Sequence, residues 1–404
     1  MNKTVKVVIG AGYGDEGKGL FTQYFSSMSD KNIVIRFNGG AQAGHTIISK
    51  NGERHVFGHF TANSFLKNAK GYLSKHFIVN PIMYLKELEQ LNNLGFYPTT
   101  ACHSHAYITT PYDMIINQWL EFSRGINLRH GSCGLGIGET VHRNEVAQHN
   151  FQIKDIISNV NLYDKMIELR EFFKIRVKQL NLSEYLEKNE IVLSDDLINN
   201  FISDIEELKK TLICGIDKLS DSYFDEYDIV FEGAQGLLLD QIMGVFPHVT
   251  RSNTGLKNVI DICVENNISD IEVLYATRCY KTRHGAGVLK NELEGKPYKN
   301  IVDETNIDNE FQGSLRFAYI DIDELIHTIE ADIFSVIDNI NKYNINIKKM
   351  IGVSCLDQSE NIKYYEKNQL LEVKNSDFFK ILPDDYITYE SWSADGTKII
   401  LKNK

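Results

Sequence analysis

The sequence lacks a basic excess, paired cysteines and any long apolar run. Its 54 aspartates and glutamates outnumber its 43 lysines and arginines, and the net charge of −11 argues against a general nucleic-acid binder, because no surplus of positive charge neutralises a phosphate backbone. The six cysteines include no C-x-x-C pair, so neither a zinc site nor a disulfide framework is indicated. No stretch of about 18 apolar residues occurs, and no signal-peptide core precedes the first strand. We expect a cytoplasmic protein with reduced thiols that binds neither nucleic acid nor a membrane.

Short runs of β-branched residues alternate with helical patterns along most of the chain. The pattern predicts strands at residues 5–9, 33–37, 77–79, 228–231, 271–276 and 349–354, and helices at 20–27, 82–94 and 322–343. This alternation favours an α/β fold with a mostly parallel central sheet. From about residue 153 to residue 227 the pattern is almost wholly helical and polar, which predicts a helical elaboration with a solvated face. Because there is no repeat, low-complexity tract or linker, we expect residues 1–404 to form a single domain.

A glycine-rich loop, GAGYGDEGKG at residues 10–19, directly follows the first predicted strand. Glycines allow backbone N–H groups to face an anion, Lys18 adds a point charge, and the next helix offers its N-terminus. The spacing G-x4-G-K is that of a P-loop, but Gly19 stands where a serine or threonine would hold Mg²⁺. That difference disfavours a P-loop GTPase. The loop instead carries Asp15 and Glu16, so a carboxylate beside the phosphates must bind the metal or move protons.

Two more glycine clusters follow predicted strands. The segment NGGAQAGHT at residues 38–46 places His45 at the carboxyl edge of the sheet, where ligands of α/β proteins bind. A histidine between glycine and threonine, beside a phosphate loop, is more typical of a functional group than of a structural one. The third cluster, FEGAQGLLLD at residues 231–240, follows the strand that ends the helical stretch.

Together these motifs resemble the adenylosuccinate synthetase family. The motifs that carry the resemblance are GDEGKG at 14–19, GGAQAGHT at 39–46, GLGIG at 134–138, FEGAQGLLLD at 231–240 and TRHGAG at 282–287. They occur in the family's order across nearly the whole chain. The resemblance implies an α/β homodimer that joins the amine of aspartate to C6 of a purine nucleotide, using a nucleoside triphosphate and Mg²⁺.

The purine 6-oxo group is a poor leaving group, so this chemistry requires its phosphorylation first, with a base at N1 and charge stabilisation at the transferring phosphoryl. The resemblance implies that Asp15 is the base and also contacts Mg²⁺, that the Gly44 carbonyl contacts Mg²⁺, and that Lys18 and His45 steady the γ-phosphoryl. The nucleotide-binding and phosphate-binding residues that it implies are Gly12, Gly14, Gly17, Gly19, Gln42, Thr46, Ser132, Cys133, Gln235, Thr250, His284 and Asp357.

Three segments depart from the family's pattern at positions that contact ligands. The aspartate-binding loop of the family is rich in arginine, whereas here Ser314 stands where an arginine reaches both aspartate and the ribose hydroxyl, and Arg316 remains for the carboxylates. The loss of that arginine permits a deoxyribonucleotide. In a second segment Cys355 replaces a lysine beside Asp357, which relaxes the donor preference from GTP toward ATP or dATP. In the third, Ser132 and Cys133 replace residues that hold the 5′-phosphate, and Arg143 is the candidate for the arginine that crosses the dimer interface.

These departures resemble the viral branch of the family, the 2-aminoadenylosuccinate synthetases. The leading hypothesis is therefore a ligase that joins L-aspartate to C6 of dGMP. Asp15 is compatible with it, because a carboxylate accepts from both N1–H and the 2-amino group of guanine. Better-known viral members have a smaller residue there, so ordinary adenylosuccinate synthesis from IMP with GTP stays the alternative. A nucleotide-binding regulator without catalysis is a third reading, against which Asp15, Lys18 and His45 together speak.

Overall fold

The computed structural model describes residues 3–125, 131–219, 226–302 and 314–402. Its centre is a ten-stranded sheet in which every neighbouring pair is parallel except the one at the C-terminal edge. In spatial order the strands are β19 (Ile399–Lys402), β18 (Ile387–Ser391), β15 (Asn346–Ser354), β11 (Asp270–Arg278), β1 (Thr4–Gly10), β10 (Asp228–Gly236), β2 (Asn32–Arg36), β5 (Lys70–Leu73), β7 (Thr99–Cys102) and β9 (Leu212–Cys214). The predicted α/β fold with a mostly parallel sheet is confirmed.

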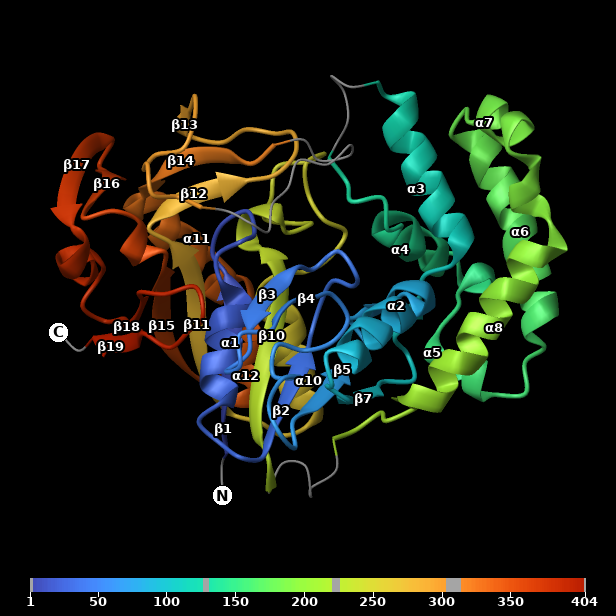
Figure 1. Cartoon of the computed structure of the whole chain (residues 1–404), viewed down its shortest axis with the longest axis horizontal. Helices are drawn as coiled ribbons and strands as arrows, with labels where there is room; N and C mark the ends of the chain where they lie inside the picture. The colour runs from blue at the N-terminus through green and yellow to red at the C-terminus, as the bar shows by residue number, and fades with distance from the viewer. Residues whose placement is uncertain (1–2, 126–130, 220–225, 303–313, 403–404) are drawn as a thin grey trace.

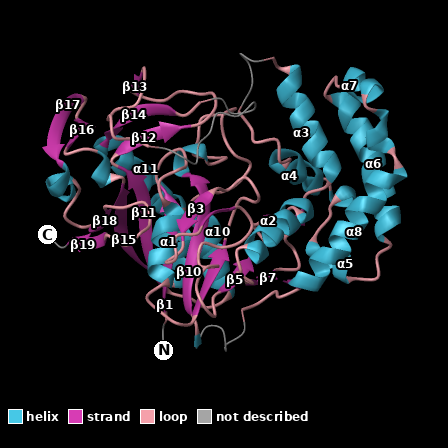
Figure 2. Ribbon diagram, in the orientation of Figure 1, coloured by secondary structure: helices cyan, strands magenta, loops and turns pink. Residues whose placement is uncertain are grey.

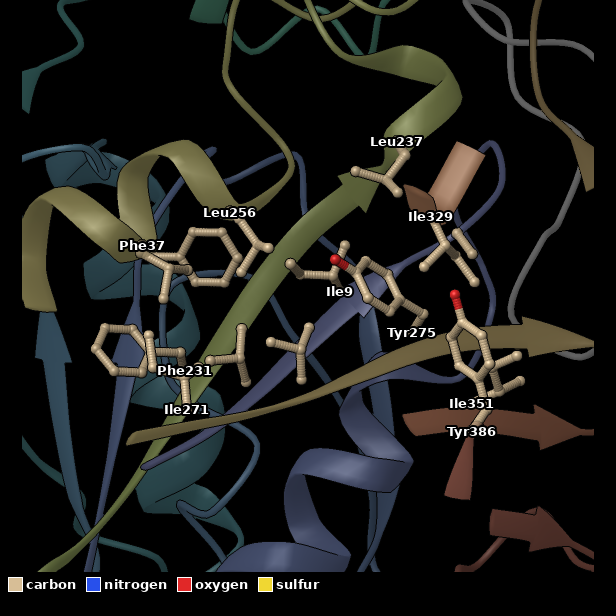
Figure 3. Packing of buried hydrophobic residues seen from close by; sticks show 14 of the residues in the cluster. Ile9, Phe37, Phe231, Leu237, Leu256, Ile271, Tyr275, Ile329, Ile351 and Tyr386 are labelled. Carbon is tan, nitrogen blue, oxygen red and sulfur yellow. The ribbon is translucent and has the colours of Figure 1, made fainter. Parts of the chain in front are cut away.

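The central strands are apolar runs because helices cover both faces of the sheet. In β1 the register places Val7 beside Phe231 of β10 on one side and beside Val273 of β11 on the other, and all three side chains are buried. Figure 3 shows Tyr275 of β11 and Ile329 of α11 among the buried side chains of one cluster. This core fixes the strand ends from which the site loops emerge.

Some helices lie on either side of the main sheet, and a second group lies beyond the end of the sheet at β7 (Figure 2). Their bounds are α1 (Lys18–Ser26), α2 (Pro81–Asn93), α3 (Pro111–Ser123), α4 (Ile137–Glu145), α5 (Ile153–Ile157), α6 (Leu162–Gln179), α7 (Ser183–Lys188), α8 (Asp195–Thr211), α10 (Leu256–Glu265), α11 (Ile322–Ser335) and α12 (Ile337–Tyr343). Figure 1 shows α3, α4, α6, α7 and α8 gathered at the side of the molecule opposite β16 and β17. None of the helices within residues 3–125, 131–219, 226–302 and 314–402 has the length and apolar composition of a membrane-spanning segment.

Three expectations about elements need correction. The stretch 153–227 holds α5 to α8, but it also contains β9, which adds a strand to the edge of the main sheet. The predicted strand at 77–79 is reduced to β6 (Ile78–Val79), which pairs with β8 (Tyr107–Ile108) outside the main sheet. The predicted helix 322–343 divides at the buried Val336, whose φ of −118° is not helical.

A smaller sheet stands beside the C-terminal half of the main one. It comprises β12 (Tyr280–Arg283), β14 (Arg316–Asp321), β16 (Asn361–Glu366) and β17 (Gln369–Lys374), with β13 (Glu292–Leu293) also paired to β14. A separate hairpin joins β3 (His45–Ile48) to β4 (Arg54–Phe57). The smaller sheet and the hairpin hold two of the loops that surround the site.

Candidate active site

A cavity of about 800 Å³ lies at the carboxyl ends of β1, β10 and β11. Its walls come from the loops that follow these strands, from the start of β3, and from α3, α4 and α6. This is where an open α/β sheet places its ligands. The predicted site residues in the wall are Gly14, Asp15, Gly17, Lys18, Gly19, Gln42, Gly44, His45, Thr46, Ser132, Cys133, Gln235, Thr250 and His284.

The phosphate loop is wound so that its amides converge on one carboxylate. Gly14 and Gly17 have φ of 98° and 87°, conformations that favour glycine. The Glu16 carboxylate accepts from the backbone N–H groups of Gly12 (3.0 Å) and Gly14 (2.7 Å), and it pairs with Lys18 Nζ at 2.6 Å. A Cβ at Gly10 would lie 2.4 Å from that carboxylate, which explains the glycine there. The Glu16 carboxylate therefore occupies N–H groups that a bound phosphate would otherwise contact. The sequence did not predict this contact.

Asp15 is fixed at both its backbone and its side chain. Its φ of 63° is left-handed, and Arg278 Nε donates to its carbonyl oxygen. His284 Nε2 lies 3.2 Å from Asp15 Oδ2. Burial alone would raise the pKa of Asp15, but the hydrogen bond from His284 and the positive charges of Arg278 and Lys18 outweigh it and hold that pKa below its usual value. Asp15 is thus an ionised carboxylate, ready to accept a proton.

His45 forms a buried dyad with a carboxylate on β10. Its Nδ1 lies 2.6 Å from Glu232 Oε1, while Glu232 Oε2 accepts from the backbone N–H of Ala62. Burial raises the pKa of Glu232, but His45 and the Arg36 guanidinium outweigh burial and bring it below its usual value. Burial also lowers the pKa of His45. We therefore assign a neutral imidazole whose Nδ1–H donates to an ionised Glu232, which fixes the orientation of the ring.

The donor set suits Mg²⁺ held largely by a nucleotide. Mg²⁺ is typically bound through one or two carboxylates together with substrate phosphates and water. The cavity wall offers the Asp15 carboxylate and the exposed Gly44 segment, next to the phosphate loop. Among the described residues no group of three or more histidines, cysteines or carboxylates is arranged to hold a metal by itself. Asp15 and the Gly44 carbonyl would hold the ion, which would neutralise charge on the phosphates.

At the other end of the cavity, polar groups hold the loop before α4. Ser132 Oγ donates to Asn117 Oδ1 at 3.0 Å and accepts from the backbone N–H of Gly134. Within the described part of the chain the buried amide atoms of Gln42 have no hydrogen-bond partner, and Gln42 lines the cavity. The Gln42 amide is therefore available to a ligand's polar groups, whereas the backbone N–H groups of Gly134 and Gly136 are engaged by Ser132 and Asn117.

Arg143, the candidate for the arginine that crosses the dimer interface, is buried within its own subunit. Its guanidinium is buried, forks onto Asp113 with Nε–Oδ1 and Nη2–Oδ2 distances of 2.9 Å, and donates to the carbonyls of Ile108 and His149. A guanidinium with these partners holds α4 against α3 and the β8 strand. The sequence could not reveal this, because an arginine near a helix end is usually solvated.

The residues predicted to bind aspartate lie outside the cavity wall. Arg316 pairs with Glu292 through Nε (2.7 Å) and Nη2, and its Nη1 donates to the carbonyls of Gly285 and Gly287. Ser314 is exposed, and residues 312–313 of the same loop lie outside the described residues. As placed here, Arg316 clamps the loop after His284 instead of reaching toward a ligand. Asp357 is likewise exposed and outside the wall, on the turn after Cys355.

Sequence reasoning named Glu16 only as one of two carboxylates beside the phosphates, and it passed over Glu232 and Arg278. A signal for Glu232 exists in the sequence, because DIVFEGAQG places a glutamate within an apolar strand and NIVIR ends on an arginine, and a buried charge needs a partner. Arg36 and Glu232 are register partners on β2 and β10. Arg278 is the last residue of β11, and Gln235 lies near the end of β10. Because ligands of α/β proteins bind at the carboxyl ends of strands, residues at strand ends next to a phosphate loop are candidates for the site.

Comparison with known proteins places the site in a family. The family model described as adenylosuccinate synthetase matches residues 7–352. Adenylosuccinate synthetase from Prochlorococcus marinus (strain MIT 9215) is 31% identical over 301 residues, which cover 74% of this chain and 66% of that protein. The enzyme from Mesoplasma florum is 30% identical over 299 residues, covering 71% of this chain and 64% of that protein. The chain thus spans just under two thirds of the length of these curated relatives.

Solved structures share the fold at low identity. A fully ligated adenylosuccinate synthetase from Plasmodium falciparum matches with a TM-score of 0.73 at 18% identity, covering 99% of this chain and 100% of the other. A cyanophage S-2L succinoaminodeoxyadenylate synthetase bound to dGMP and dATP matches with a TM-score of 0.65 at 12% identity, covering 99% and 96%. The sequence relatives above carry the name of the ordinary synthetase, and the likeness to the phage enzyme is one of fold.

Proposed function

Because the chain belongs to the adenylosuccinate synthetase family, we propose that it is a ligase that joins the amine of L-aspartate to C6 of a 6-oxopurine nucleotide. The observation that supports this most is the meeting of Asp15, Lys18 and His45 in the wall of one cavity at the end of β1. An ionised base, a phosphate-binding cation and an oriented imidazole are the groups that phosphorylation of a purine oxygen requires.

The reaction proceeds in two displacements. As the N1 proton passes to Asp15, the purine O6 attacks the γ-phosphorus and the nucleoside diphosphate leaves. The aspartate amine then attacks C6, the C6–O bond breaks, and inorganic phosphate departs with the oxygen that was O6. Lys18 and His45 stabilise the transferring phosphoryl, with Glu232 holding the imidazole.

For the acceptor we propose dGMP. Ser314 in place of an arginine removes a group that would contact the ribose hydroxyl, and a carboxylate at Asp15 matches the adjacent N1–H and 2-amino donors of guanine. IMP is the second candidate, favoured by Asp15 itself and by the names of the sequence relatives. For the donor we propose a purine triphosphate, with ATP or dATP ahead of GTP because Cys355 offers no cation to a guanine ring.

A panel assay decides among these substrates. Phosphate release is measured with L-aspartate and Mg²⁺ for dGMP, GMP, dIMP and IMP, each with ATP, dATP and GTP. The product of each reaction is identified by mass spectrometry. We expect the highest kcat/KM with dGMP. Turnover confined to IMP would replace the dGMP proposal, whereas nucleotide binding without turnover of any pair would identify a regulator. Asp15→Asn is the control, and it should abolish turnover while nucleotide binding persists.

A further inference from the structure

His284 is held against Asp15 by a clamp in the smaller sheet. It follows β12 directly, and its Nε2 lies 3.2 Å from Asp15 Oδ2 with about a quarter or less of either side chain exposed. The two glycines after it have φ of 69° and 103°. Their carbonyls both accept from Arg316 Nη1, at 2.9 and 2.8 Å.

The clamp is itself anchored on both sides. Arg316 is the register partner of Arg283, the residue before His284, and its guanidinium is paired with Glu292 on β13. On the opposite side a Cβ at Gly131 would lie 2.6 Å from the Cα of Gly285, so the loop before α4 backs directly onto this loop. The position of the imidazole is therefore set by backbone contacts on two sides.

The hydrogen bond to Oδ2 restricts rotation of the Asp15 carboxylate. A carboxylate oxygen has two lone pairs, so Oδ2 can accept from His284 and still accept a second donor, and Oδ1 has two lone pairs of its own. Arg278 holds the Asp15 backbone at the same time. Both oxygens are thus presented in a fixed plane.

We infer that His284 is a positioning residue that aligns the two Asp15 oxygens for simultaneous contact with N1–H and the 2-amino group, and so makes the site selective for 2-amino-6-oxopurine nucleotides. In guanine these two donors are parallel neighbours, and a carboxylate locked in plane meets both. Hypoxanthine has the N1–H donor but no 2-amino group, so its binding free energy depends less on a fixed orientation of the Asp15 carboxylate. This inference rests on the proposed function for its choice of ligand, and it stands on the geometry of His284 and Asp15.

The test uses binding, so that it does not depend on turnover. dGMP and dIMP differ only in the 2-amino group, and each is titrated calorimetrically into the full-length wild type, His284→Ala and His284→Gln. Wild type should prefer dGMP by about tenfold or more, the effect of one hydrogen bond to a charged acceptor. His284→Ala should reduce that ratio toward one, mainly by weakening dGMP. His284→Gln, whose amide N–H reaches a similar distance, should recover most of the ratio.

Controls separate this role from a structural one. His327→Asn, on an exposed position of α11, should keep the wild-type ratio. A wild type that binds both nucleotides equally or binds neither, an equal loss of both in His284→Ala, or a glutamine variant that behaves like alanine would each overturn the inference. If wild type prefers dGMP but no nucleotide is turned over, the proposed ligase activity fails while the ratio still decides the role of His284.

Discussion

Replacing Glu232 with glutamine removes the charge behind His45 while keeping the size of the side chain. In the structure the Nδ1–Oε1 distance is 2.6 Å, and Glu232 is fully buried between His45, the Ala62 amide and Arg36. In the proposed mechanism His45 donates a hydrogen bond from Nε2 to the γ-phosphoryl. Because Nδ1 already carries the proton that faces Glu232, this donation requires a second proton on the ring. A buried carboxylate stabilises that imidazolium when the phosphoryl anion arrives, whereas a neutral amide does not.

The size of the effect follows from the negative charge that the acceptor of the His45 hydrogen bond loses. A hydrogen bond to a charged group contributes about 1.5–3 kcal/mol, and each 1.36 kcal/mol at the transition state is about tenfold in rate. We therefore expect Glu232→Gln to lower kcat by about tenfold to hundredfold. The KM for the acceptor nucleotide should change little, because the acceptor does not contact this dyad in the proposed mechanism.

The assay is steady-state phosphate release at saturating aspartate, with thermal unfolding recorded for each variant. Glu87→Gln is the matched control, because Glu87 is also a buried carboxylate near Arg36 and accepts from the Gly58 and His59 amides, but it lies outside the cavity wall. It should lower stability and leave kcat at the wild-type level. A wild-type kcat in Glu232→Gln, or an equal loss in both variants, would refute the role given to the dyad.

Two further predictions concern stability. Arg143→Ala should lower the free energy of unfolding in urea by about 3–5 kcal/mol, because it leaves the Asp113 carboxylate buried without its guanidinium. Unchanged stability with a lowered kcat would contradict this and would favour a role for Arg143 at a subunit interface. Burial raises the pKa of Asp332 to about 7, against the opposing hydrogen bonds from Leu256 N and Tyr275 and with Asp240 nearby. The carboxyl group therefore stays protonated to a higher pH in the folded state than in the unfolded state. As the pH rises from 5 to 7, the free energy of unfolding should fall by up to about 1.4 kcal/mol per pH unit. Asp332→Asn should lose that part of the slope, and a slope equal to wild type would contradict it.

The central strands and the phosphate loop were predictable because their signals are local. Buried parallel strands are runs of β-branched residues, as in β1 and β11, and a glycine loop before a lysine indicates a phosphate site whatever surrounds it. The strands β5, β7 and β9 are only three or four residues long, too short to give such a signal, and they form by pairing toward the sheet edge. The division of helix 322–343 at Val336 likewise depends on what that side chain packs against.

Residue roles were harder to predict than elements, because they depend on which distant segments meet. Asp15, Lys18 and His45 lie in motifs, and all three line the cavity. Arg316 and Arg143 were assigned by their position in a motif, but each guanidinium is already engaged by carboxylates and carbonyls from other elements. His284 could be predicted to line the cavity, but its contact with Asp15 depends on the pairing of β12 with β14.

The most direct test of the central claim follows the purine oxygen. The acceptor nucleotide is labelled with ¹⁸O at C6 and incubated with L-aspartate, Mg²⁺ and the preferred triphosphate, and the released phosphate is analysed by mass spectrometry. The account predicts that the ¹⁸O appears in inorganic phosphate in step with product formation. Product formed with the label in water, and none in phosphate, would contradict phosphoryl activation of O6.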